Sequence, residues 1–73
     1  MADVQLDCQG MNCPMPIVRV SQAMKKMSGG QTLAARADDP AFSADIKAWV
    51  KKMGYELLEF EEGPVQCAVI RKS

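Results

Sequence analysis

A cysteine followed by two prolines is the feature of this 73-residue chain best suited to chemistry, in the segment Cys13-Pro14-Met15-Pro16. The pattern predicts that Cys13 lies at or just before the first turn of a helix, where unpaired N–H groups and the helix dipole favour a thiolate over a thiol. The same field would stabilise a persulfide anion. Pro14 and Pro16 stiffen this turn, but each also removes an N–H group that could have bonded the sulfur. We therefore expect a nucleophilic thiol that is activated only in part, as suits a group that both accepts and releases sulfur.

The alternative interpretation of Cys13 is a simple helix cap, although cysteine caps helices poorly compared with Ser, Thr, Asp or Asn. Cys8 either resolves an oxidised or persulfidated Cys13 or is a small apolar residue near a strand end, and the usual burial of free cysteines favours the second interpretation. Cys67 lies in a β-branched segment and is predicted to belong to the core. Met11 and Met15 flank Cys13 and form either a soft docking patch for changing partners or partly buried loop residues.

Composition excludes several classes of function. The chain has no His, so a Cys–His hydrolase is not expected, and its three cysteines lack the spacing of a common zinc site. No glycine-rich phosphate loop is present. Nine basic and nine acidic side chains balance, so direct nucleic-acid binding is not expected. With no apolar run of membrane-spanning length and no basic leader, the expected location is the cytoplasm, where thiols stay reduced.

Six segments are predicted to alternate between strand and helix. The predicted strands are residues 4–8, 31–37, 55–61 and 65–71. The first predicted helix covers residues 14–27, and the second begins at the acidic cap and proline of Asp38-Asp39-Pro40 and ends at Gly54. Apolar stripes at helical spacing define the buried faces of the two helices: Ile17, Val20, Met24 and Met27, then Phe42, Ile46, Trp49, Val50 and Met53.

This order predicts one domain, residues 1–73, with an α/β (α+β) two-layer sandwich of the βαβαββ type. Because each helix links one strand to the next, the first three strands should run parallel, and a short turn makes the fourth antiparallel to the third. The result is a mixed four-stranded sheet with two helices on one face. Both helices then start at the same end of the sheet, which brings Cys13 and Asp39 to one set of loops.

Several motifs along the chain resemble those of the TusA/SirA-like sulfur carrier family, over residues 6–71. They are Leu6-Asp7, Gly10-Met11, Cys13-Pro14-Met15-Pro16, Gly30, Asp38-Asp39-Pro40, Asp45-Ile46, Trp49 and Gly54-Tyr55-Glu56-Leu57. The resemblance implies the βαβαββ fold and a persulfide on Cys13, without a metal or an organic cofactor. It also implies a cysteine desulfurase or rhodanese-like donor and a downstream acceptor protein, as in tRNA thiolation, molybdenum cofactor supply or sulfur oxidation.

The chain departs from the family pattern at two positions beside Cys13. Met15 stands where members often have an acidic residue, and Asn12 where a basic one is frequent. We therefore expect Met11, Asn12 and Met15 to contribute to partner contact, with Pro14, Pro16 and Asp39 supporting Cys13.

The leading hypothesis is a sulfurtransferase-type carrier that works by transpersulfidation, rather than a stand-alone turnover enzyme. Two alternatives remain open: a non-catalytic regulatory or protein-binding module, in which Cys13 is incidental, and a dithiol redox protein that uses Cys8 and Cys13.

Overall fold

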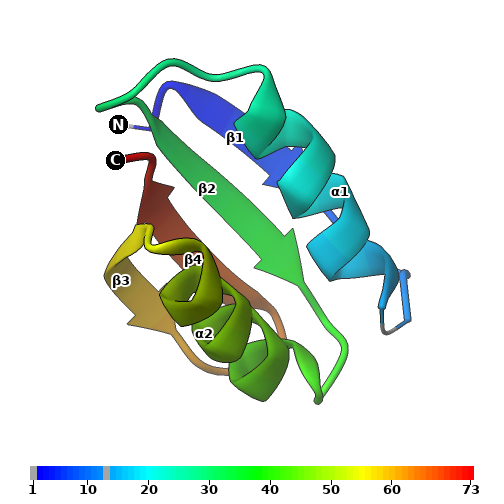
Figure 1. Cartoon of the computed structure of the whole chain (residues 1–73). Helices are drawn as coiled ribbons and strands as arrows, with labels where there is room; N and C mark the ends of the chain where they lie inside the picture. Colours follow the sequence, from blue (N-terminus) through cyan, green and yellow to red (C-terminus); the bar gives the residue numbers. More distant parts are fainter. Residues whose placement is uncertain (1, 13) are drawn as a thin grey trace.

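The computed structural model describes residues 2–12 and 14–73, which form the six predicted elements in the predicted order (Figure 1). They are β1 (Val4–Asp7), α1 (Met15–Lys25), β2 (Thr32–Ala37), α2 (Phe42–Met53), β3 (Glu56–Glu61) and β4 (Gln66–Arg71). The predicted bounds of the strands hold to within one residue at each end. In the described part of the chain, no helix is long and apolar enough to cross a membrane.

The four strands form one mixed sheet in the order β1-β2-β4-β3 (Figure 1). The strands β1 and β2 are parallel, and β4 pairs antiparallel with both β2 and β3. The first three strands therefore point the same way, as predicted. However, β3 does not pair with β2, because the hairpin places β4 between them and leaves β3 at an edge.

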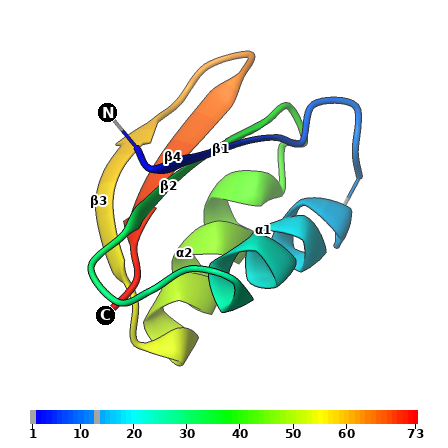
Figure 2. The same cartoon turned by 90° about the horizontal axis from the view of Figure 1, so that it is seen from above.

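Both helices cover one face of the sheet and leave the other face open, which confirms the predicted two-layer sandwich (Figure 2). The helix α1 packs against β2, and α2 packs against β3 and β4. Alternate residues of the two central strands point toward the helices, as a strand with one buried face requires. The resulting core contains Val20, Met24, Leu33, Ala35, Ala37, Phe42, Ile46, Val50, Ala68 and Ile70.

Ile17 and Trp49 are partly buried and pack against this core, whereas Cys67 and Met53, also predicted to be buried, are not among the residues that form it or pack against it. Gln66, Ala68 and Ile70 take the inward positions of β4, so the period-two alternation turns Cys67 toward the open face, where it is half-buried. Met53 is 46% exposed, because it is the last residue of α2 and lies beyond the turn that Val50 packs into the core. The prediction of a core position was therefore wrong for Cys67 and for Met53.

The start of α2 also differs from the prediction of an acidic cap followed by proline. The helix begins at Phe42, with Ala41 as its N-cap residue. Asp39 instead accepts hydrogen bonds from the Ala41 N–H at its side-chain Oδ1 (3.1 Å) and from the Phe42 N–H at its backbone carbonyl (3.0 Å). Pro40 is thus the second residue of a tight turn that precedes the helix, a position that its fixed φ favours.

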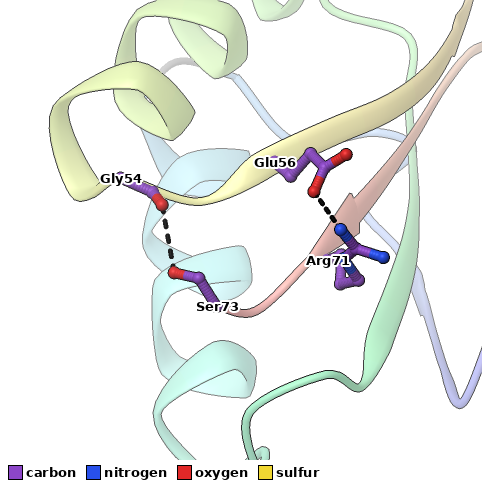
Figure 3. Close-up of polar contacts among 4 residues, drawn as sticks. All are labelled: Gly54, Glu56, Arg71 and Ser73. Carbon is purple, nitrogen blue, oxygen red and sulfur yellow. Dashed lines mark hydrogen bonds and ion pairs between the residues drawn. The ribbon is translucent and has the colours of Figure 1, made fainter.

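Polar contacts of the C-terminal segment lie at the end of the sheet opposite the starts of the helices (Figure 3). The Ser73 hydroxyl donates to the Gly54 carbonyl at 3.0 Å, and Arg71 pairs with Glu56 across β4 and β3. Gly54 ends α2 with a left-handed φ of 76°, as predicted for a glycine C-cap.

Candidate functional site

The Cys-Pro-Met-Pro segment leads into α1, but Cys13 itself lies outside the described residues. On its C-terminal side, Pro14 is the N-cap residue of α1 and Pro16 is the second residue of the helix, which confirms that both prolines belong to the helix start. Pro16 is fully buried, whereas Pro14 is exposed. The Met15 N–H donates to the Asn12 carbonyl at 2.8 Å, and the Val18 N–H donates to the Pro14 carbonyl at 3.1 Å. The backbone on both sides of Cys13 is therefore held by hydrogen bonds.

Among the described residues, the first turn of α1 has neither a side-chain cap nor an acidic residue of its own. A helix start of this kind favours a negative charge beside it. The described part of this helix start is thus compatible with the activated thiol that the sequence predicts, and that prediction stays a prediction because Cys13 lies outside the described residues.

Residues 8–12 form the first part of the loop between β1 and α1, ahead of Cys13. The Cys8 N–H donates to the Arg36 carbonyl of β2 at 2.7 Å, and the Met11 N–H donates to the Cys8 carbonyl at 3.2 Å. Gly10 has a φ of 81°, in the left-handed region that glycine reaches without a side-chain clash, as expected for the predicted turn residue.

This loop contacts the loop that follows β2. The Gly10 N–H donates to the carboxylate of Asp38, at 3.0 Å from Oδ1 and 3.2 Å from Oδ2. The next residue, Asp39, forms the turn before α2, and its carbonyl accepts a hydrogen bond from the buried Gln66 side chain at 2.8 Å. The two βα loops therefore meet at one end of the sheet, as the order of the elements implied.

Sequence reasoning missed Asp38 as a member of this site and named Asp39 instead. The pair Asp38-Asp39 was interpreted as a local helix cap, whereas Asp38 bonds a residue 28 positions away. The available signal was its position directly after β2, since loops that follow neighbouring parallel strands lie at the same sheet end.

Cys8 lies in the core with no exposed surface. Burial raises the pKa of its thiol; the positive charge of Arg19 opposes this rise and the negative charge of Asp7 adds to it. A buried thiol with a raised pKa is a poor nucleophile, because the thiolate is the reactive form. The environment of Cys8 thus favours the interpretation of a structural residue over that of a resolving thiol.

The three residues expected to contact partners differ in exposure. Met11 is half-buried and packs against the core, whereas Asn12 is exposed and Met15 is 47% exposed. Val18, three residues after Met15 in α1, is 38% exposed, and the sequence analysis did not single it out. Residues three apart on a helix are neighbours, so Met15 and Val18 form an apolar patch at the start of α1.

The described residues contain no cluster of three or more His, Cys, Asp or Glu side chains that could hold a metal ion. Cys67, the third cysteine, lies opposite Arg36 in the β2–β4 pairing, on the open face of the sheet. It lines a shallow depression of about 190 Å³ together with Gln5, Leu6, Asp7, Ala34 and Arg36. This depression is on the face away from the helices, so it is separate from the loops around Cys13.

Comparisons with known proteins agree with this fold and motif. The sequence model of the family described as "Sulfurtransferase TusA" matches residues 4–72. The chain is 43% identical over 72 residues to the sulfur carrier protein TusA of Allochromatium vinosum, covering 97% of this chain and 95% of that protein. The crystal structure of a SirA-like protein from Desulfitobacterium hafniense superposes with a TM-score of 0.80 at 21% identity, covering 93% of this chain and 95% of that one. The structural likeness supports the two-layer fold.

Proposed function

Since this chain belongs to the sulfurtransferase TusA family, we propose that it accepts sulfane sulfur as a persulfide on Cys13 and passes it to an acceptor protein. The observation that carries this proposal is the start of α1, which follows Cys13 directly in sequence. No described side chain caps this helix, and its first turn has no acidic residue. An anionic sulfur beside it would be stabilised by the helix dipole.

The proposed reaction consists of two exchanges at sulfur. In the first, the Cys13 thiolate attacks the outer sulfur of a donor persulfide, so that a new S–S bond forms on Cys13 and the donor leaves as a thiolate. In the second, an acceptor thiolate attacks the outer sulfur on Cys13, takes it as its own persulfide and releases the Cys13 thiolate. Each exchange breaks one S–S bond and forms another, so no net oxidant or reductant is consumed.

The partners in this proposal are a cysteine desulfurase or a rhodanese-like protein as donor, and a further protein thiol as acceptor. The exposed Met15 and Val18 suit such transient contacts, because they are apolar and Met side chains adapt to different surfaces. The chain needs no resident cofactor for either exchange. A reducing compartment would keep the Cys13 thiol available between cycles.

The test is the intact mass of the protein after incubation with a cysteine desulfurase, cysteine and pyridoxal phosphate. We expect wild type to gain the mass of one sulfur atom, and a reductant to remove it. Cys67→Ser is the matched control, because it removes a half-buried thiol on the open face of the sheet, away from the helices, and it should gain sulfur like wild type. Cys13→Ser should gain none.

Three results would contradict the proposal. A gain that persists in Cys13→Ser would place the sulfur elsewhere. The absence of any gain from the desulfurase, from a rhodanese with thiosulfate and from polysulfide would favour a binding module. A loss of two hydrogens, abolished in Cys8→Ala, would indicate a Cys8–Cys13 disulfide and a dithiol redox protein.

A further inference from the structure

The contact between Gly10 and Asp38 joins the segment before Cys13 to the rest of the fold. Gly10 lies three residues ahead of Cys13, and its N–H donates to both oxygens of the Asp38 carboxylate. The other described hydrogen bonds of residues 9–12 are local: the Gln9 N–H donates to Asp7, the Met11 N–H to Cys8, and the Asn12 carbonyl accepts from Met15. Among these described bonds, the Asp38 contact therefore provides the long-range anchor of this segment.

The loop needs such an anchor because of its composition and its position. Glycine has the largest conformational freedom of any residue, and loops are more mobile than the elements they connect. Gly10 is exposed, and apart from its two chain neighbours no atom of the described residues lies within 4 Å of the place where its Cβ would be, so packing among these residues does not fix it. A hydrogen bond from an N–H to an ionised carboxylate is stronger than a neutral one and selects one loop conformation.

We propose that Asp38 is a positioning residue for sulfur transfer, which holds the segment before Cys13 in the conformation that a partner protein requires. This inference rests on the proposed function of Cys13. Transfer between two proteins needs the attacking and the accepting sulfur aligned inside a docked complex, and each alternative loop conformation lowers the fraction of productive encounters. A small reagent in solution has no docking geometry to satisfy. Asp38 should therefore control transfer between proteins far more than the intrinsic reactivity of the thiol.

The chain offers a matched control for the loss of such a bond. The Asp3 carboxylate accepts a hydrogen bond from the Thr32 N–H at 2.9 Å and joins two segments 29 residues apart. Like Asp38, Asp3 is exposed, but it lies at the start of β1 and β2, the end of the sheet opposite the loops that contain Gly10 and Asp38. Removal of either carboxylate costs one long-range bond to a backbone amide, and only Asp38 belongs to the Cys13 end.

The experiment measures two rates for each variant: single-turnover transfer of labelled sulfur from a persulfidated cysteine desulfurase, and alkylation of Cys13 by iodoacetamide. For Asp38→Ala we expect transfer to slow about tenfold, equivalent to about 1.36 kcal/mol of barrier. Alkylation should stay within about twofold of wild type, because the helix start that activates the thiol is retained. Asp38→Asn keeps an acceptor oxygen and should restore transfer to within about twofold of wild type. Asp3→Ala should change neither rate.

Several outcomes would overturn the inference. Transfer in Asp38→Ala at the wild-type rate would show that the contact is dispensable, and an equal slowing in Asp3→Ala would show a general effect of destabilisation. A parallel loss of transfer and alkylation would mean that Asp38 acts on the thiol itself. Urea unfolding of each variant checks its fold. If Asp38→Ala does not fold, Gly10→Ala is the second variant, because an alanine at this left-handed φ disturbs the same hydrogen bond from the Gly10 side. Gly10→Ala must then slow sulfur transfer and leave the alkylation rate unchanged. If wild type accepts no sulfur, the proposed function fails and this inference with it; if wild type accepts sulfur and Asp38→Ala does so equally fast, only this inference fails.

Discussion

The anchoring of the far end of α1 by Lys72 leads to a quantitative prediction about stability. The Lys72 ammonium donates to the carbonyls of Met24 and Met27, both at 2.7 Å, although these residues are 48 and 45 positions earlier in the chain. Carbonyls at a helix C-terminus are incompletely bonded within the helix: the Met24 carbonyl accepts one backbone bond, from the Met27 N–H at 3.1 Å. A cation beside these carbonyls also interacts favourably with the helix dipole. Lys72 thus ties the C-terminal segment to the helix that follows Cys13.

We expect Lys72→Met to lower the free energy of unfolding by about 2 kcal/mol. A hydrogen bond to a charged group contributes roughly 1.5–3 kcal/mol. The two bonds share one half-buried ammonium, and in the variant water can hydrate the freed carbonyls. The loss should therefore be smaller than the sum of two separate bonds. The methylene groups of Lys72 are largely replaced by those of methionine, which limits any loss of packing. For a domain of this size, about 2 kcal/mol corresponds to a fall in Tm of roughly 8–16 °C.

The assay is urea unfolding at pH 7, followed by far-UV circular dichroism and by the fluorescence of Trp49. Lys52→Met is the control, because Lys52 is an exposed cation in the last turn of α2 whose side chain has no hydrogen bond to any of the described residues. This control should change stability by no more than about 0.5 kcal/mol. An equal loss in the two variants, or a loss below about 0.5 kcal/mol in Lys72→Met, would refute the assignment of stability to these two bonds.

Three further predictions concern the cysteines and a glycine. Burial raises the pKa of Cys8, so the folded state keeps the thiol proton to a higher pH than the unfolded state does. The resulting contribution to the free energy of unfolding is complete below the pKa of an unfolded thiol, about 8.5, and is lost as the pH rises toward the folded pKa. Urea midpoints measured from pH 7 to 10 should therefore fall more steeply for wild type than for Cys8→Ala, and equal slopes would contradict this. In native protein pulsed with iodoacetamide, peptide mass should show Cys67 labelled before Cys8, because Cys67 is half-buried and Cys8 is fully buried; the reverse order would place Cys8 outside the core. Gly54→Ala should destabilise the fold by roughly 1–2 kcal/mol through its φ of 76° alone, since no other described part of the chain lies within 4 Å of the new Cβ. Gly29→Ala, at a glycine without positive φ, should be nearly neutral in the same urea experiment.

The sequence alone determined the features that depend on neighbours along the chain. The spacing of Val20, Met24, Ile46 and Val50 marks helix faces because residues three and four apart share one side of a helix. Gly54 marks a helix end because a left-handed φ favours glycine in any protein. The element order then limits the fold to a two-layer sandwich, since helices that connect parallel strands pack on the sheet. The Cys-Pro-Met-Pro motif indicated its chemistry in the same local way.

Only the tertiary structure decided which residues far apart in the chain meet. The insertion of β4 between β2 and β3, and its register against β2, turned Cys67 to the open face, because a shift of one residue exchanges the two faces of a strand. The contacts of Asp38 with Gly10 and of Lys72 with α1 join segments separated by 28 to 48 residues. Such contacts depend on where the strands place their loops and ends. Local periodicity carries no information about which loops and ends lie close together in space. The side chain of Asp38 could thus be assigned to the loop before Cys13 only after the sheet had brought the two loops together.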